Sequence, residues 1–445
     1  YWIPASISEL TNLNMFFSIL LCGSGFCLMG ILYGFLFLVI KFLWNKLPWL
    51  IPFILPGFEW LCIPVFPISL GYSWRASLAG VQAADIGGVY FLSSLCCFYS
   101  YLIFLGIQNI SMRKWYWSGA LILLYLQYSY GCIRIYSIQK TPPQSQVKIS
   151  ILQTGIAPKN KIDDTIGTYN KVIAQLEKAA LELPDTELFI LPESIFVPTF
   201  KSQDDWRLRR LNFILSTNQA LLFGCNTQAE ERCFNSMGFI KGGTLKSHVS
   251  EINNDVSRSS VLVKDTPSDI EISYYRKQKL ILLGEYIPFM KYTPALSEKI
   301  SALTHTNQFN AGDTNIAFSF KRFKLFPFIC IESMYGGWVA EANHKLNDTD
   351  ILINITEDGW FGTSKASQLH LYAIAFRAIE MRKPLVRSVN VGYSSFINEW
   401  GEEKLLDFNG KTVEILDPSA ACHFVATASK RSIFSFYASG GYLFE

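Results

Sequence analysis

Three reactive side chains stand in a fixed order in this chain, far apart in sequence and each in or just after an apolar segment. Glu193 follows the apolar run 188–192, Lys277 stands in a loop after a strand-like segment, and Cys330 lies within the apolar run 328–331. A carboxylate, an amine and a thiol are the parts of a cysteine-based acyl-transfer site. The thiolate attacks, the carboxylate accepts the thiol proton, and the ammonium stabilises the oxyanion. The order therefore predicts a catalytic triad.

Each residue also has a simpler interpretation. Cys330 could be a buried core cysteine, and Glu193 could open a helix at its N-terminus. Lys277 is close to Lys279 and could belong to a solvated basic loop. Singly, these interpretations are the stronger ones, whereas the three residues together, in this order and with these flanks, favour the triad.

The elements that must position these groups differ between two parts of the chain. Residues 1–140 carry ten of the chain's 75 charged residues, and the remainder carries 65. Half of all residues are hydrophobic and 17% are charged, below the quarter that is usual in soluble domains. This predicts a membrane part followed by a soluble part. The small net charge of +3, without a basic stripe, predicts no nucleic-acid partner.

Four apolar segments have the length of membrane spans, which need about 20 residues. They are residues 15–40, 49–70, 86–107 and 115–133. Lys and Arg gather in the loops on one side, so the positive-inside rule makes that side cytoplasmic and places the chain after residue 134 on the outer face. Glu59 in the second segment is either a carboxylate paired near the interface or a buried group that supports a site.

After a Pro-containing linker at 141–145, strands and helices alternate, which predicts layered sheets with helices outside. The expected strands are 147–153, 187–191, 220–225, 234–240, 271–275, 315–320, 328–331, 350–355, 385–390 and 394–398. The expected helices are 163–183, with Ile166 on its buried face, 205–218 and 365–382. One strand starts at residue 328 because Pro327 would interrupt a longer central strand. The polar residues 243–268 are expected to form an insertion loop.

Cysteine usage suggests neither a metal nor a cofactor. Six of the ten cysteines lie in apolar runs and are expected to act as small hydrophobic residues. Cys225 and Cys233 could form a disulfide if this part is exported. The cysteines and the five histidines show no metal-ligand spacing.

The order Glu, Lys, Cys with these flanks resembles the carbon–nitrogen hydrolase (nitrilase) superfamily. Membrane segments followed by the triad and by the run Asn-Ile-Thr-Glu-Asp-Gly-Trp-Phe-Gly at 354–362 are similar to one branch, the apolipoprotein N-acyltransferases. Other similar motifs are Gly71-Tyr72-Ser73, Leu78-Ala79-Gly80, Arg377-Ala378, Glu380, Arg387-Ser388 and Asn390-Val391-Gly392. The resemblance covers essentially the whole chain. Because that family has eight spans, we expect further spans before Tyr1 and after Glu445.

The resemblance implies a fold and a location. It implies a multi-span α-helical membrane domain over residues 1–140 and a nitrilase-like αββα sandwich over 141–434. Residues 435–445 would begin the connection to a last span. The protein would lie in the bacterial inner membrane, with its catalytic domain on the periplasmic face, and we expect a monomer.

The implied reaction has two steps. Cys330 takes an acyl chain from a phospholipid, usually phosphatidylethanolamine, as a thioester. The α-amine of the diacylglyceryl-cysteine of an apolipoprotein then takes the chain. Glu193 would be the general base and Lys277 the oxyanion stabiliser. The implied supporting residues are Glu285, which orients Lys277, Glu332, and Trp360 beside the substrate.

Three positions depart from the family's usual pattern. They are Ile331 in place of an aromatic residue, Ile281-Leu282-Leu283 in place of Val-Pro-Phe, and Glu357-Asp358 in place of Asn-Asp. Because the triad is intact, these differences bear on substrate preference more than on activity.

Two other functions remain open. A membrane-tethered amidase or nitrilase would share the triad and use water as the acceptor. A polytopic transporter or receptor with an inactive outer domain would instead depend on Glu59 and Asp85, which lie in or near the spans.

Overall fold

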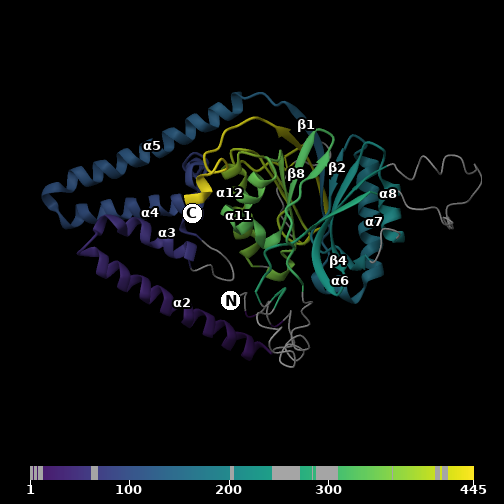
Figure 1. Cartoon of the computed structure of the whole chain (residues 1–445), viewed down its shortest axis with the longest axis horizontal. Helices are drawn as coiled ribbons and strands as arrows, with labels where there is room; N and C mark the ends of the chain where they lie inside the picture. Colours follow the sequence, from purple (N-terminus) through teal and green to yellow (C-terminus); the bar gives the residue numbers. More distant parts are fainter. Residues whose placement is uncertain are drawn as a thin grey trace, which may run out of the picture.

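The computed structural model describes residues 14–61, 69–200, 205–242, 271–282, 284–286, 309–362, 364–405, 411–412 and 419–444, with Pro4 and Ser8. Long helices from the N-terminal part of the chain extend away from a sandwich of two β-sheets (Figure 1). The insertion loop predicted at 243–268 and the departing residue Leu283 lie outside the described residues.

The helical part consists of α2 (Met15–Trp44), α3 (Ile51–Leu61), α4 (Ala84–Gln108) and α5 (Arg113–Lys140), joined by short 3-10 helices. By length and composition, α2 and the segment Gly80–Gln108 could cross a membrane. Helix α3 has 11 residues, and α5 has 28 but is less apolar. Two of the four predicted segments therefore have the character of spans within the described residues.

Within the described residues, the first sheet contains seven strands. Their order is β12 (Cys422–Lys430), β1 (Ser145–Gln153), β2 (Leu188–Ile190), β4 (Ala220–Ala229), β5 (Arg232–Lys241) and β6 (Ile272–Arg276), with β3 (Phe196–Phe200) paired to β4. Strands β1, β2 and β4 are parallel, and the ladders at both sides of this group are antiparallel. Glu193 follows the carboxyl end of β2, at the middle of the sheet.

The second sheet contains five strands in the part of the chain that the structure describes. Their order is β11 (Ser395–Ile397), β10 (Leu385–Val389), β9 (Ile351–Thr356), β8 (Phe323–Ile329) and β7 (Phe318–Phe320). Strands β8, β9 and β10 are parallel. Cys330 follows the carboxyl end of β8, so both sheets present a candidate catalytic residue just beyond a parallel strand.

Apolar side chains of the strands alternate between two faces. Inward-facing residues such as Ile149 of β1 and Leu325 of β8 form one core between the sheets. The outer faces pack against helices α7 (Thr165–Glu182) and α8 (Trp206–Ile214) on one side and α11 (Gly336–Lys345) and α12 (Ala366–Met381) on the other. The predicted αββα sandwich is confirmed.

Several local predictions are wrong. Strand β8 continues through Pro327. Strand β7 pairs only with residues 323–325, so at Pro327 one side of β8 has no described strand beside it. A proline, which has no backbone N–H to donate, is tolerated at such a position. Ile166 is 72% exposed, since α7 turns Thr168 and Val172 inward instead. Strands β3 and β12 and helix α11 have no counterpart among the predicted elements.

The possible disulfide is also absent. Cys225 and Cys233 are both free. They lie on adjacent strands, but the register pairs Cys225 with Ser236 and Cys233 with Gln228. The two thiols are therefore held apart along the hairpin.

A buried ion pair joins the helical part to the sandwich. Asp85, at the start of α4, accepts hydrogen bonds from Nε and Nη2 of Arg382 at 2.9 and 2.6 Å. Arg382 directly follows α12. Arg134 and Tyr130 of α5 donate to the same carboxylate. Because Asp85 is 1% exposed, a single buried carboxylate holds α4, α5 and α12 together.

We expect Asp85→Ala to lower the free energy of unfolding by about 3–5 kcal/mol, because Arg382 would stay buried without its counter-charge. Thermal unfolding of the detergent-purified protein, followed by tryptophan fluorescence, measures this as a lower midpoint. Lys148→Ala breaks an exposed pair with Asp185 and is the control, with an expected loss below about 1 kcal/mol. Equal midpoints for the two variants would contradict the role given to Asp85.

Candidate active site

Cys330 lies where β8 ends and the chain turns into the 3-10 helix η6 (Cys330–Met334). The strand predicted over 328–331 therefore ends at Ile329, and Cys330 has a left-handed backbone with φ of +51°. A residue other than glycine is strained there, so the surroundings must hold it. Glu332 contributes, since its Oε2 accepts from the Ile329 N–H at 2.6 Å. The thiol leaves the strand ladder yet stays buried, at 6% exposure.

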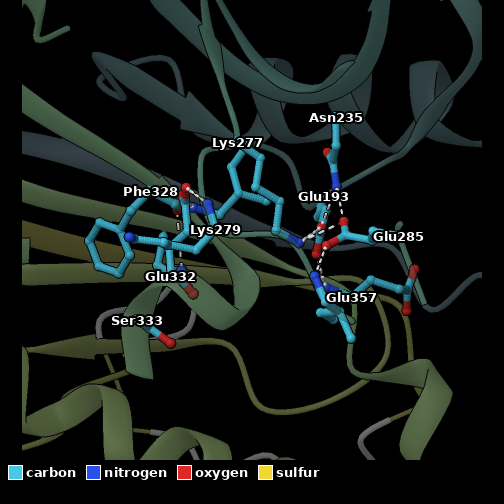
Figure 2. A network of polar contacts seen from close by, with 12 residues as sticks. Glu193, Asn235, Lys277, Lys279, Glu285, Phe328, Glu332, Ser333 and Glu357 are labelled. Carbon is cyan, nitrogen blue, oxygen red and sulfur yellow. Dashed lines mark hydrogen bonds and ion pairs between the residues drawn. The ribbon is translucent and has the colours of Figure 1, made fainter. Parts of the chain in front are cut away.

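Glu332 also connects this turn to the loop that carries Lys277. Its Oε1 accepts from the backbone N–H groups of Gln278 at 2.6 Å and Lys279 at 3.1 Å (Figure 2). The Tyr275 hydroxyl donates to the same carboxylate at 2.8 Å. Burial raises the pKa of Glu332 to about 7, although its hydrogen-bond donors act to lower it. The predicted supporting carboxylate thus bridges two segments of the site.

Lys277 follows β6, and its ammonium lies between two carboxylates. Its Nζ donates to Glu285 Oε1 at 2.8 Å and to Glu193 Oε1 at 3.2 Å (Figure 2). Burial by itself would lower the pKa of Lys277, but Glu193, Glu285 and Cys330 outweigh it and raise the pKa well above its usual value. With 1% of its side chain exposed, Lys277 is a fixed positive charge inside the protein.

Glu193 lies in a turn after β2 and does not open a helix, since Ser194 has a φ of +47° and β3 follows. Glu193 Oε1 also accepts from Asn235 Nδ2 at 2.7 Å, and Oε2 accepts from the Glu357 N–H at 2.8 Å. Asn235 belongs to β5 and has no counterpart among the predicted site residues. Its signal in the sequence is weak, because it is one amide next to Ser236 in a strand of mixed composition, and its burial at 2% exposure is seen only in the structure. Three donors therefore set the orientation of Glu193.

The thiol of Cys330 interacts electrostatically with both Glu193 and Lys277. Burial raises its pKa, Glu193 raises it further, and Lys277 lowers it by less, so the pKa lies well above the usual value. A thiol with such a pKa is protonated at neutral pH and would need a base in order to attack as a thiolate. Among the residues that the structure describes, no group of three or more His, Cys, Asp or Glu is arranged to hold a metal ion.

Two of the departing positions, Ile331 and Leu282, differ in their surroundings. Ile331 is 1% exposed and packs with Met334 in a small cluster. Tyr72, from the 3-10 helix η2 (Leu70–Ala76) of the helical part, packs against this cluster. Leu282 lies in the loop after Lys277 and is 38% exposed. The helical part thus reaches the residues next to Cys330.

Glu357, the third departure, is buried and paired. Its carboxylate accepts from Lys161 Nζ and, at 2.7 Å, from Asn390 Nδ2. Because the Glu357 N–H is one of the donors to Glu193, this pairing fixes part of the site. Trp360 lies three residues further on, in the 3-10 helix η7 (Gly359–Phe361), and is 37% exposed.

A thiol, a carboxylate and an ammonium in one buried site can act together on a carbonyl carbon. The sequence from residue 148 to 419 matches the carbon-nitrogen hydrolase family model. Since this match covers more than half of the chain, the protein belongs to the carbon-nitrogen hydrolase family.

Curated relatives extend the similarity. The apolipoprotein N-acyltransferase of Geobacter metallireducens is 25% identical over 370 residues, which are 81% of this chain and 63% of that protein. The apolipoprotein N-acyltransferase of Rickettsia prowazekii is 25% identical over 376 residues, 82% of this chain and 66% of its own length. This chain thus spans slightly less than two thirds of the length of these relatives. The predicted resemblance to that branch is confirmed.

Solved structures are similar as well. A CN-hydrolase superfamily protein from Xanthomonas campestris superposes with a TM-score of 0.42 at 15% identity, covering 64% of this chain and 91% of its own.

The raised pKa of Cys330 predicts how its alkylation depends on pH. Because the thiolate is the reactive form, the rate with iodoacetamide should rise about tenfold per pH unit between pH 7 and 9. Lys277→Met removes the group that lowers this pKa and should slow the reaction at each pH. Peptide mass spectrometry follows Cys330 separately from the other cysteines. A rate that is already constant below pH 7 would show a preformed thiolate and contradict the prediction.

Proposed function

We propose that this protein is an N-acyltransferase that moves a fatty acyl chain from a phospholipid to the α-amine of the diacylglyceryl-cysteine of apolipoproteins. The extent of the similarity carries the proposal. Relatives named apolipoprotein N-acyltransferase match 81% and 82% of the chain, and therefore more than the hydrolase region 148–419. A hydrolase domain by itself would account only for that region.

In the proposed first step, Glu193 accepts the proton of the Cys330 thiol as the sulfur attacks the ester carbonyl carbon of a phospholipid. The carbonyl oxygen becomes an oxyanion, which the Lys277 ammonium stabilises. When the intermediate collapses, the carbon–oxygen bond breaks and Glu193 returns its proton to the departing glycerol oxygen. The products are a lysophospholipid and a Cys330 thioester.

In the proposed second step, the acceptor amine attacks the thioester carbonyl. Glu193 takes a proton from the amine nitrogen, and Lys277 again stabilises the oxyanion. The carbon–sulfur bond breaks, an amide forms, and Glu193 returns the proton to the Cys330 sulfur. The free enzyme is restored without any co-reactant.

Glu285 and Asn235 support these roles by position. Glu285 accepts from Lys277 at 2.8 Å, while Asn235 donates to both carboxylates, to Glu193 at 2.7 Å and to Glu285 at 3.0 Å. Glu332 holds the two loops of the site together. We assign Trp360 to the wall beside the substrate, because it follows the Glu357 segment and keeps part of its ring exposed.

The helical part, residues 1–140, is proposed to cross a bacterial inner membrane several times, with the catalytic domain, 141–434, on the periplasmic face. Helix α2 supports this, because large residues such as Phe16 (69%), Ile31 (69%) and Phe37 (66%) are exposed. A core helix of a soluble protein would bury them. We further propose phosphatidylethanolamine as the donor and a monomeric enzyme.

The residues on which a transporter would depend are occupied by structural contacts. Asp85 is paired with Arg382. Glu59 accepts hydrogen bonds from the Ser69 and Ser93 hydroxyls and from the Leu70 N–H, all at 2.8 Å. Both carboxylates thus fasten segments of the helical part to their neighbours.

Intact-protein mass spectrometry tests the acyl-enzyme. After incubation with phosphatidylethanolamine, the detergent-purified full-length protein should gain the mass of one fatty acyl group, which hydroxylamine removes. Cys330→Ala should insert into the membrane normally and gain no mass. A diacylated lipopeptide should clear the adduct. If water alone clears it, the protein is a hydrolase, and if no adduct forms, the proposed reaction is wrong.

We expect Lys277→Met to slow thioester formation by about 10²- to 10³-fold, because the site loses its oxyanion-stabilising charge. Lys279→Met is the matched control: the Lys279 ammonium lies 5.9 Å from the Tyr335 ring centre and should affect the rate only slightly. Rapid-quench measurement of the thioester gives both rates. Near-normal activity of Lys277→Met would remove Lys277 from the mechanism.

A further inference from the structure

A series of hydrogen-bonded, buried side chains leads away from the turn at Cys330. Ser333 Oγ, on η6, lies 3.1 Å from His370 Nε2, and His370 Nδ1 lies 2.9 Å from Asp358 Oδ1. Asp358 Oδ2 accepts from Arg387 and Ser367, both at 2.6 Å. All five residues are at least 95% buried. The catalytic steps proposed above use none of them.

The same network of buried side chains also contacts the segment before Cys330. Arg387 Nη1 donates to Asn354 Oδ1 at 3.2 Å, and Asn354 Nδ2 donates to the Phe328 carbonyl oxygen at 3.2 Å. Phe328 stands two residues before Cys330, and Ser333 stands three residues after it (both labelled in Figure 2). Both arms of the strained turn are therefore tied to one buried network.

The same network reaches the general base. Asp358 directly follows Glu357, whose N–H donates to Glu193 Oε2 at 2.8 Å. A shift of the Asp358 backbone would move this donor. Ser333 and Asp358 thus connect His370 to the segment of the proposed nucleophile and to the segment that orients its base.

Hydrogen-bond geometry and charge indicate the proton positions. Burial would raise the pKa of Asp358, but Arg387 and His370 lower it below its usual value, so the carboxylate is charged. Burial and Arg387 lower the pKa of His370, so the imidazole is neutral at physiological pH. We therefore assign the His370 Nδ1–H as the donor to Asp358, which leaves Nε2 to accept from the Ser333 hydroxyl.

We propose that His370 is a positioning residue: through Ser333 and Asp358 it holds the Cys330 turn in place relative to Glu193. The reason is mechanical. A left-handed cysteine at the end of a strand relaxes unless both arms of its turn are held, and a displacement of about 1 Å between reacting groups can slow a reaction about 10²-fold. In its effect on acyl transfer, the inference rests on the proposed function.

The test compares Ser333→Ala and His370→Ala with Thr349→Val. Thr349 is 1% exposed and its hydroxyl donates to Asn343, but it lies at the opposite end of β9 from Asp358. The control therefore removes a buried hydroxyl hydrogen bond of the same domain, away from the site. His370→Gln restores an acceptor for Ser333 and is the rescue variant. Thermal midpoints of all variants show whether each one folds.

Two readouts on the full-length protein separate this inference from the proposed function. The first is the rate of Cys330 alkylation by iodoacetamide, which needs no lipid. The second is single-turnover thioester formation with phosphatidylethanolamine, resolved into a maximal rate and a half-saturating donor concentration. If wild-type protein forms no thioester, the proposed function fails, and alkylation still decides the inference.

Ser333→Ala should lower the maximal rate about 10-fold and His370→Ala about 100-fold, with the half-saturating concentration unchanged. Alkylation should slow in the same order, His370→Gln should recover part of the loss, and Thr349→Val should stay within about twofold of the wild type. Rates for Ser333→Ala and His370→Ala that equal those of Thr349→Val would overturn the inference. A loss that only follows the thermal midpoint, without rescue by His370→Gln, would also overturn it.

Discussion

The buried ammonium of Lys277 is the interaction on which the rest of the site depends. A charge removed from water needs compensating charge and hydrogen bonds around it. Glu193 and Glu285 supply the charge, and Asn235 donates to both carboxylates from the middle of β5. Glu193 and Lys277 follow the ends of two different strands, and Glu285 lies in a loop. The sandwich must therefore bring those segments and β5 together whenever it folds. The charge arrangement that suits catalysis is therefore also a condition for a stable core.

The turn at Cys330 adds a second constraint, because Cys330 has a backbone conformation that it would not adopt alone. Glu332 holds one side of this turn and fastens it to the Lys277 loop. The buried chain from Ser333 to Asp358 holds the other side. Strain of this kind persists only where the surrounding structure over-determines it. The polar groups packed around Cys330 meet that condition.

Helix α12 connects the site to the helical part. His370 lies near the N-terminal end of this helix. Further along, the Phe376 ring packs edge-on against the Tyr72 ring, with 5.1 Å between the ring centroids. Arg382 follows the last turn and pairs with Asp85. One rigid element thus contacts both the network behind the nucleophile and the helices proposed to lie in the membrane. The geometry of the thiol and the seating of the catalytic domain on those helices are therefore mechanically coupled.

The sequence by itself determined the two-part organisation, the layered sandwich and the candidates Glu193, Lys277 and Cys330, because apolar periodicity and motif order are local properties that residue types record directly. It did not reveal Asn235 or His370, since a single amide or imidazole carries no pattern of its own. Nor did it predict that β8 continues through Pro327, which depends on how far the neighbouring strand β7 extends. Only the tertiary structure decided that Asn235 joins the two carboxylates beside the ammonium and that Cys330 leaves its strand in a left-handed turn. The physical reason is that burial, desolvation and backbone strain arise when segments far apart in the chain pack against each other.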